Sequence, residues 1–522
     1  MFLKLLDPQM VELNVRATNQ RVREKAELYS RALDALNNAL DVEALPADVR
    51  AILSRNPNTA YLRKMSTVNT FSYNEVLAIY GYSILMGIER RRSECDVHEL
   101  RGNNIFSFPA AACATTRKRI QLFNTCFGIC ERERERELYP LKVAKVYDFV
   151  QRLRENFVKA YVPDCALVVD EHIIRFKGRV SFAVYMPNKP DPKGIKLWMM
   201  CDRYNYVCNF QIYSGEEGER VASGGERTRE INQTSRVVTD MLSVLPKNRQ
   251  YHVTTDRFFT SQNLANKLWC QNITLLGTMR KSQKEIPLPL RERDEHGHKY
   301  DRPADSSMYA YQMQCTILSR SSKSKKLFFI LSTRHYNDSY DNEANLPRMV
   351  VDYNKSKCYV DVADQLVKNY TCERKTKKWT LAVFRRLLDF AAHNAKIIHD
   401  VSTMQRDNGS RPDKRKHFLA CLAMELIAAY ATERFYSQSI PRLRKLQIHK
   451  YFDIPMPDIS GSIAGVETIR KRCFACGPNS NNKTRYVCSQ CSMYVCRKHC
   501  NVTYITSCLQ CLQLQTVFSD AV

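Results

Sequence analysis

The sequence predicts a mixed α/β core set between helical segments, followed by a cysteine-rich segment. Three observations indicate this organisation. Apolar residues recur at helical spacing up to about residue 165 and again after about residue 370, whereas the residues between follow the period of short strands. Eight of the 20 cysteines fall between Cys473 and Cys511. The length of 522 residues allows roughly three to four domains.

The composition predicts a soluble protein with a polyanionic partner. Lys and Arg number 80 against 54 Asp and Glu, which gives a net charge of +26. Nucleic acid is the first candidate for a partner of such a chain and an anionic membrane surface is the second. No apolar run reaches the ~18 residues that cross a bilayer. The N-terminal residues contain no apolar stretch of signal-peptide length, so we expect an intracellular protein.

Helical periodicity dominates the first 165 residues. The predicted helices are Gln9–Leu40, Tyr73–Ile88 and Val143–Val158. The run from Glu131 to Glu137 alternates in charge, and we interpret it as a solvated helix or loop held by salt bridges.

From Cys165 onward the period becomes that of strands separated by turns. Predicted strands cover Leu167–Val169, Val180–Met186, Ile195–Cys201, Val207–Tyr213, Val253–Thr255 and Ile273–Met279, with helices at Asn232–Leu245 and Ser261–Trp269. Three meander strands followed by helix, strand, helix and strand is the order of an RNase H-like α/β core.

A polar segment from Lys284 to Arg348 interrupts this rhythm. It contains two predicted strands, Tyr309–Leu318 and Lys326–Thr333, and we expect a small β insertion. The core then resumes with a predicted strand at Met349–Tyr353 and a helix at Val360–Tyr370.

Residues 371 to 450 are helical and basic, with 17 Lys and Arg against 7 Asp and Glu, so 17 − 7 gives +10. Lysines and arginines at this density neutralise DNA phosphates, although a solvated helix face is the alternative. One predicted helix face is apolar and consists of Trp379, Val383, Leu387, Phe390, Ala391 and Ile398.

Carboxylates occur at the ends of the predicted core elements. Asp170 follows the apolar run Ala166–Val169, and Asp256 follows Tyr251–Thr255. Asp361 and Asp364 come after Met349–Tyr353 and share one face of a predicted helix because they are three residues apart.

These four acids suit metal-dependent chemistry at phosphorus. Two-metal phosphoryl transfer requires about three carboxylates around ions ~3.5–4 Å apart. Mg²⁺ prefers such oxygen ligands. A single aspartate at a strand end is more often a turn former or a helix cap, so spacing alone favours a structural role for each. The neighbouring Glu171 and Asp352 are interpreted as structural.

The terminal cysteines follow the pattern C-x2-C-x11-C-x2-C-x4-C-x2-H-x8-C-x2-C. Eight such ligands fit two tetrahedral Zn²⁺ sites. An alternating order predicts a cross-brace, in which Cys473, Cys476, Cys496 and His499 hold one ion and Cys488, Cys491, Cys508 and Cys511 hold the other. Cys500 is an alternative ligand to His499. A segment of this size is expected to need the metal to fold.

Several stretches resemble piggyBac-type transposases in order and spacing over nearly the whole chain. They are VVDEHIIRFKGR, YMPNKPDPKGIKLWMMCD, TTDRFFTSQNLA, GTMRKSQKEIP, YVDVADQ and ERKTKKW, together with the terminal cysteines. Motifs that match in register are more specific than any one of them.

The resemblance implies that Asp170, Asp256 and Asp361 are a catalytic triad with Mg²⁺ or Mn²⁺, and that Asp364 is an additional acid of the site. It implies cleavage at the inverted-repeat ends of a transposon through DNA hairpins, and joining to TTAA targets. It also implies a homodimer that acts in the nucleus. The expected DNA contacts are Arg280, Lys281, Arg374, Lys375, Lys377, Lys378 and Trp379, although core packing is an equal alternative for Trp379.

The predicted domains follow from these assignments. Residues 1–165 and 371–455 form a helical dimerisation and DNA-binding domain, and 166–283 with 349–370 form the catalytic core. Residues 284–348 are the β insertion, 456–472 a linker and 473–511 the zinc finger.

Departures from the family pattern keep other hypotheses open. Arg257 replaces the usual Asn after the second acid, and Cys358 and Tyr359 replace small residues before the third. A domesticated or decayed relative that binds DNA without cutting it is therefore an alternative to an active transposase. A RING-type ubiquitin ligase, suggested by the cysteine segment alone, agrees less with the rest of the chain.

Overall fold

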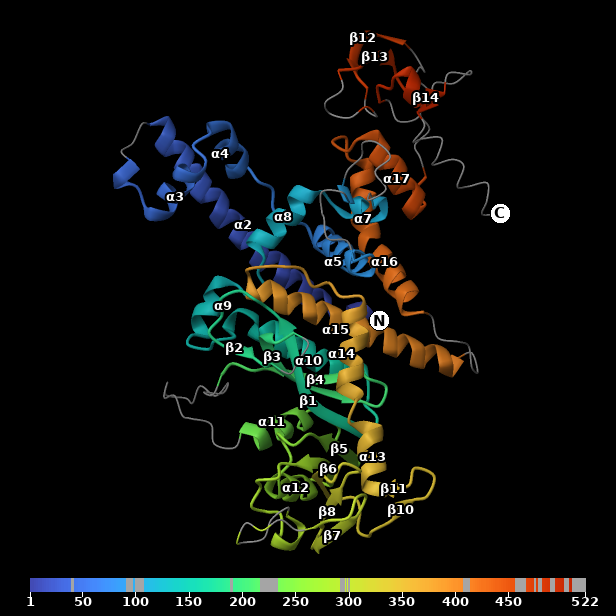
Figure 1. The fold of residues 1–522 in the computed structure, drawn as a ribbon. Coiled ribbons are helices and arrows are strands. Elements are labelled where there is room, and N and C mark those ends of the chain that lie inside the picture. The colour runs from blue at the N-terminus through green and yellow to red at the C-terminus, as the bar shows by residue number, and fades with distance from the viewer. Residues whose placement is uncertain are drawn as a thin grey trace. The chain divides into compact units, whose positions relative to one another are not determined.

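One sheet of nine strands lies at the centre of the part of the chain that carries the predicted acids. Its strands are β1 Ala166–Arg175, β2 Ala183–Tyr185, β3 Lys193–Asp202, β4 Val207–Ile212, β5 Tyr251–Thr255, β6 Ile273–Met279, β7 Ser307–Gln312, β8 Cys315–Ser321 and β9 Leu327–Ser332. The strand order is β2-β3-β1-β5-β6-β9-β8-β7, and β4 also pairs with β3. The strands of the predicted insertion therefore extend the core sheet through β9 and β6 (Figure 1).

This computed structural model describes residues 1–38, 42–90, 97–98, 108–187, 191–215, 233–291, 296, 298, 301–406, 414–455, 466–473, 476, 481–488, 493–501 and 507–508. The chain divides into two units. The first joins Met1–Ala17 to Gly128–Arg415 and holds the sheet, and the second joins Thr18–Phe127 to Lys416–Val522.

Helices surround the sheet in the first unit. They are α1 Phe2–Leu5, the start of α2 Pro8–Asn37, α9 Arg132–Glu137, α10 Tyr147–Ala160, α11 Gln233–Leu242, α12 Gln262–Trp269, α13 Arg348–Ser356, α14 Tyr359–Asn369 and α15 Trp379–Arg406. A short hairpin, β10 Tyr340–Asp341 with β11 Leu346–Pro347, precedes α13. Two helices predicted for the flanking helical domain, α10 and α15, belong to this unit.

The second unit is built mainly from helices. They are the rest of α2, α3 Ala47–Arg55, α4 Thr59–Ser66, α5 Tyr73–Ile88, α7 Pro109–Ala114, α8 Arg117–Cys126, α16 Arg415–Tyr436 and α17 Arg442–Phe452. Gly81 on α5 permits close packing, because a Cβ there would lie 2.5 Å from the carbonyl oxygen of Ala423 on α16. The terminal segment adds β12 Val466–Arg472, β13 Lys483–Tyr486, β14 Cys500–Asn501 and β15 Ser507–Cys508.

The predicted mixed α/β core with helical segments is confirmed, and many bounds agree. The helix at Tyr73–Ile88 and the strands at Tyr251–Thr255 and Ile273–Met279 lie where the sequence places them. The alternating run Glu131–Glu137 forms α9, where Arg134 bonds Glu137 at 2.9 Å. In the described part of the chain, no helix is both long and apolar enough to cross a membrane.

Three predictions are wrong, and in the first two tertiary contacts outweigh a local pattern. The first strand does not end at Asp170 but continues to Arg175, since β3 pairs with it along that whole length. Met349–Tyr353 belongs to helix α13, whose residues Met349 and Val350 pack against the sheet residue Leu276 and its neighbours. The predicted strand Tyr309–Leu318 is a hairpin of β7 and β8.

The missed hairpin turn lacks the usual marker residue. Met313 occupies the turn with a φ of 49°, a conformation that Gly or Asn normally adopts. Met313 is 95% exposed, so this apolar residue is not part of a core. An apolar residue at an exposed turn gives no sequence signal that the strand ends there.

His393 of α15 is a buried anchor between that helix and the turn after β3. One ring nitrogen, Nε2, donates to the carbonyl oxygen of Asn205 at 2.8 Å. The other, Nδ1, accepts from Nη1 of Arg415 at 2.8 Å, so both nitrogens are used by the neutral ring. Burial lowers the pKa of His393 to about 3, and the charge of Arg415 adds to this effect.

We expect His393 to make the first unit less stable in acid. An unfolded histidine binds a proton below a pH of about 6.5, while the folded one stays neutral down to about 3. The free energy of unfolding should therefore fall by about 1.4 kcal/mol per pH unit within this window. His393→Gln preserves a donor and an acceptor but cannot titrate. Urea unfolding from pH 7 to pH 4 should show a steeper loss for the wild type, and parallel curves would contradict the assignment.

Candidate functional site

Asp170 and Asp256 each come directly after the last paired residues of two adjacent parallel strands, Asp170 within β1 and Asp256 just after β5. The parallel pairing of β1 with β5 ends at Val169 and Thr255, and the two aspartates are the next residues of each chain segment. Neighbouring strands are about 4.8 Å apart, and residues at matching positions of parallel strands point to the same face. Both side chains are half-buried. This register was not predictable from the sequence, which placed Asp170 at the end of its strand.

Local hydrogen bonds orient both carboxylates. Oδ1 of Asp170 accepts from the backbone N–H of Glu171 at 2.7 Å, and Oδ1 of Asp256 accepts from that of Phe258 at 2.9 Å. Burial raises the pKa of Asp256, and the N–H of Phe258 opposes that shift. A partly buried acid with a raised pKa gains most when a cation or proton neutralises it.

Helix α14 brings one further acid, Asp364, to this part of the sheet. His172 lies two residues after Asp170 and therefore on the same face of β1, and its Nδ1 is 3.1 Å from Oδ1 of Asp364. Nζ of Lys368 contacts the second carboxylate oxygen of Asp364 at 2.8 Å. Burial raises the pKa of Asp364, but the interactions with His172 and Lys368 outweigh it and lower the pKa. Asp361 lies one turn earlier on α14 and is exposed.

The acids do not form a closed cage in the described part of the chain. Among the described residues, only the C-terminal Cys and His cluster has three or more ligand atoms within 4.8 Å of one another. Ionised carboxylates repel one another, so their ligand atoms are not expected to converge without a cation. The donor set of hard oxygens on one face suits Mg²⁺ or Mn²⁺. Asp170 and Asp256 are the pair that the fold holds together most directly.

A cluster of one cation and aromatic rings, which was not predicted from the sequence, supports the segments that follow both acids. Nζ of Lys196 contacts Glu171 at 3.1 Å and lies 3.7 Å from the ring centroid of Trp198. Trp198 stacks on Phe258 at 5.4 Å. Glu171 directly follows Asp170, and Phe258 lies two residues after Asp256. The cluster therefore links the two backbone segments that carry these acids. The motif GIKLW was a visible sign of it, although only the register shows which residues it meets.

Gly277 of β6 allows the segment that carries Asp256 to pack closely. A Cβ at this position would lie 2.2 Å from Oγ1 of Thr260 and 2.8 Å from the carbonyl oxygen of Thr255. The two threonine hydroxyls bond each other at 2.7 Å across the turn that contains Asp256.

We expect Gly277→Ala to displace this turn and to lower the free energy of unfolding by about 1–3 kcal/mol. The matched control is Gly215→Ala, where the nearest side-chain atom is 3.2 Å away but the φ of 111° alone causes strain. Thermal unfolding of both variants separates the two effects. If Gly277→Ala retains wild-type stability, the close packing beneath Asp256 is not rigid.

The predicted DNA-contact residues occupy two places in the first unit. Arg280 and Lys281 are exposed after β6, and the Arg280 guanidinium lies 5.4 Å from the ring of Phe258. The second group lies in the connection between α14 and α15, where Lys375 and Lys377 are exposed and Arg374, Lys378 and Trp379 are half-buried. Trp379 packs edge-on against Phe182 at 5.3 Å, which favours a packing role for its ring.

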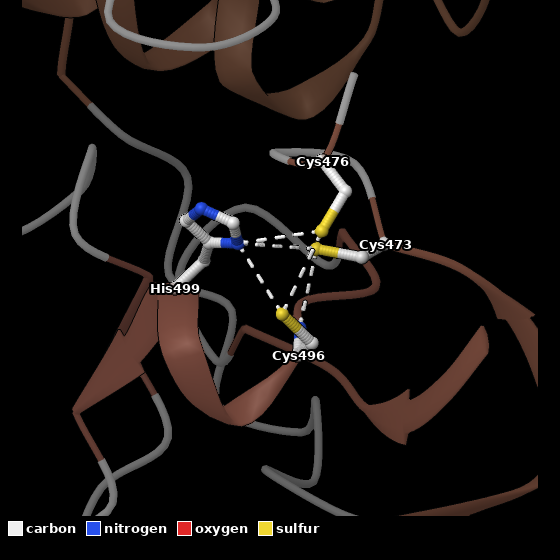
Figure 2. A group of neighbouring side chains, drawn as sticks. All are labelled: Cys473, Cys476, Cys496 and His499. Carbon is white, nitrogen blue, oxygen red and sulfur yellow. Dashed lines mark hydrogen bonds between the residues drawn. The ribbon is translucent and has the colours of Figure 1, made fainter. Parts of the chain in front are cut away.

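One of the two predicted zinc ligand sets is brought together at the C-terminal end. Cys473, Cys476, Cys496 and His499 point toward one another, with all four ligand atoms within 4.8 Å (Figure 2). The Sγ atoms of Cys476 and Cys496 are 3.8 Å apart, and Nδ1 of His499 lies 3.6 Å from Sγ of Cys476. Zn–S bonds of about 2.3 Å place two sulfurs of a tetrahedral site about 3.8 Å apart, so the cluster could hold a zinc ion.

The second predicted ligand set lies largely outside the described residues. Cys491 and Cys511 and the side chain of Cys508 are not described, whereas Cys488 is buried. The second zinc site therefore stays a prediction. The same holds for Cys500 as a ligand, because its side chain is not described.

Comparison with known proteins identifies the class. A family profile described as Transposase IS4 matches residues 1–396, which is more than half of the chain. Among solved structures, the chain is similar to a piggyBac transposase in a synaptic complex with hairpin DNA. That match has a TM-score of 0.72 and 22% identity, and it covers 97% of this chain and 96% of the other.

The protein is thus a transposase by class. The chain belongs to the transposase IS4 family, and its fold is similar to that of the piggyBac transposase. The resemblance noted from the sequence motifs is confirmed by these two findings.

Proposed function

We propose that this chain is a DNA transposase of the three-aspartate type with an RNase H-like core. It cuts DNA at transposon ends through hairpin intermediates and joins the ends to TTAA targets. The observation that carries the proposal is that Asp170 and Asp256 each directly follow the last paired residues of the parallel strands β1 and β5, while Asp364 of α14 contacts His172, two residues after Asp170.

Asp170, Asp256 and Asp361 would hold the divalent cations in this proposal. Mg²⁺ or Mn²⁺, when bound, supplies activation of the attacking oxygen and stabilisation of the leaving oxygen. The two strand acids provide a rigid base because hydrogen bonds to Glu171 and Phe258 fix their carboxylates. Asp364 would position α14 through His172 and Lys368.

All steps of the proposed reaction are in-line displacements at phosphorus, so one site can serve each of them. Water attacks the first phosphodiester and releases a 3′-hydroxyl. This hydroxyl attacks the opposite strand to give the hairpin, which is reopened, and finally it attacks the target. The basic residues Arg280, Lys281, Arg374, Lys375, Lys377 and Lys378 would hold the DNA backbone during these steps, with salt-dependent affinity.

The remaining assignments belong to the same proposal. The chain would act as a homodimer in the nucleus, and its C-terminal domain would hold two zinc ions in a cross-brace and help to bind the transposon end. The first zinc site is supported by the Cys473, Cys476, Cys496 and His499 cluster.

The unusual residues before Asp361 are compatible with the proposed site. Tyr359 is accommodated at a cavity of about 230 Å³ between α13 and the sheet, and α14 is formed from that residue onward. A bulky residue at this position is therefore compatible with a helix that carries Asp361.

The test is incubation of the full chain with a duplex transposon end and Mg²⁺ or Mn²⁺. Nicks followed by hairpins, absent with EDTA, would support the proposed transposase. Tight DNA binding without any nick, under conditions in which the protein is folded, would support the domesticated DNA-binding relative instead. Nicks that occur only at sites other than the transposon end would contradict the proposed substrate.

A further inference from the structure

The connection between α14 and α15 carries the basic residues but is tied down at one end by buried polar groups. Asp389 of α15 is 4% exposed. Its carboxylate accepts from Oγ1 of Thr371 at 2.6 Å and from the backbone N–H of Cys372 at 2.8 Å. The first two residues of the connection are therefore held by one buried carboxylate.

Arg386, one turn before Asp389 on α15, holds the next residue. Its side chain is fully buried, and its Nη2 donates to Oε1 of Glu373 at 2.6 Å. Nη1 is 4.0 Å from Asp389, while Nε and Nη1 have no hydrogen-bond partner among the described residues. Glu373 and Asp389, together with the charge of Asp364, stabilise this buried guanidinium, so its pairing is strongly preferred over separation.

The backbone of the connection is also fixed at Arg374. Nη1 of Arg385 donates to its carbonyl oxygen at 3.3 Å. Beyond Arg374 the connection becomes exposed to solvent, because Lys375 and Lys377 are exposed whereas Cys372 is buried. Side chains of α15 thus hold four consecutive residues, Thr371–Arg374, and the two exposed lysines follow directly after them.

We propose that Arg386 and Asp389 are positioning residues for DNA binding, which hold Thr371–Arg374 so that Lys375 and Lys377 meet the phosphates of duplex DNA. This inference rests on the proposed function, which supplies DNA as the binding partner. Neither Arg386 nor Asp389 touches DNA in this arrangement, because both are buried. Their effect is to preorganise two flexible lysines and so reduce the ordering that binding requires.

The test measures the salt dependence of binding of the full chain to a labelled duplex by fluorescence anisotropy. The slope of log binding constant against log salt concentration is negative. Replacing both lysines, by Lys375→Ala with Lys377→Ala, should make this slope shallower by about 1.8, or ~0.9 for each phosphate contact. Asp389→Asn should make the slope shallower by a similar amount. In the combined variant the alanines should cause no further change, because the lysines are already displaced.

A second variant covers the case in which Asp389→Asn does not fold. Thr371→Val removes one hydroxyl at the start of the connection, which donates to Asp389 and accepts from the N–H of Glu373. We expect a smaller decrease that is again not additive with the effect of the alanines. The matched control is Thr432→Val on α16, whose hydroxyl bonds only its own helix and which should leave the slope unchanged. Arg386→Lys should retain more of the slope than Arg386→Met.

Additive effects of the alanines in either background would overturn the inference while leaving the transposase proposal intact. A folded wild-type chain that shows no salt-dependent binding to duplex DNA would overturn both, and that outcome is visible before any variant is made. Nicking activity plays no part in the measurement, so a chain that binds without cutting still decides the inference.

Discussion

Asp170→Asn is expected to reduce the rate of DNA nicking roughly 10³-fold, which is about 4 kcal/mol of transition-state stabilisation. The amide keeps the size of the side chain and its hydrogen bond from Glu171, but it removes the negative charge that a hard cation requires. Of the two acids that follow the paired strands, only Asp256 then keeps its carboxylate, so the cation loses one of two firmly held ligands. The single-turnover rate on a pre-nicked and an intact transposon end, at saturating protein, measures the chemical step directly.

Two further measurements separate this loss from a loss of structure. The variant should unfold at the wild-type temperature and bind duplex DNA at least as tightly, because one negative charge near the DNA is gone. Mn²⁺ binding by calorimetry should weaken at least about tenfold. Asp240→Asn is the matched control, since Asp240 forms an ion pair with Arg236 on the same helix, α11, and the substitution changes the charge equally. Undiminished nicking by Asp170→Asn would falsify the proposed triad.

Removal of zinc is expected to unfold the C-terminal segment while leaving the sheet intact. A structural zinc site contributes about 10–16 kcal/mol of apparent binding free energy in small fingers, and this segment has few large apolar residues to compensate. The structure supports the first site through the tetrahedral spacing of its ligands and the N–H of Cys496, which lies 3.2 Å from Sγ of Cys473. Chelation should therefore make the residues after about 470 sensitive to a protease.

Elemental analysis and mass spectrometry of the cleaved chain measure this result. The cross-brace predicts two zinc ions per chain, and Cys496→Ser should lose at least one. Cys421→Ser, an exposed cysteine on α16, is the control that should change neither zinc content nor protease sensitivity. A zinc-free chain with a protease-resistant terminus would show that the Cys and His cluster is stabilised by other means.

The sequence predicted those elements that local patterning decides. Strand β5 ends in three consecutive β-branched residues, Val253–Thr255, so its C-terminal end and the position of Asp256 directly after it were visible. Helix α12 begins at the capping residue Ser261, whose hydroxyl accepts from the N–H of Leu264. The paired cysteines were equally clear, because ligand spacing is a property of the chain and not of its packing.

The tertiary structure decided the features that depend on distant partners. Asp170 lies within β1 because β3 sustains that strand to Arg175, and α13 is a helix because its apolar face meets β6 and β9. The contact of His172 with Asp364 and the grip of Asp389 on Thr371 join residues far apart in sequence or in separate elements. Residue types and spacing thus determined which acids and cysteines could act in this protein. Their register, burial and neighbours were decided by the pairing of strands and the packing of helices, because those interactions depend on segments that local sequence patterns do not connect.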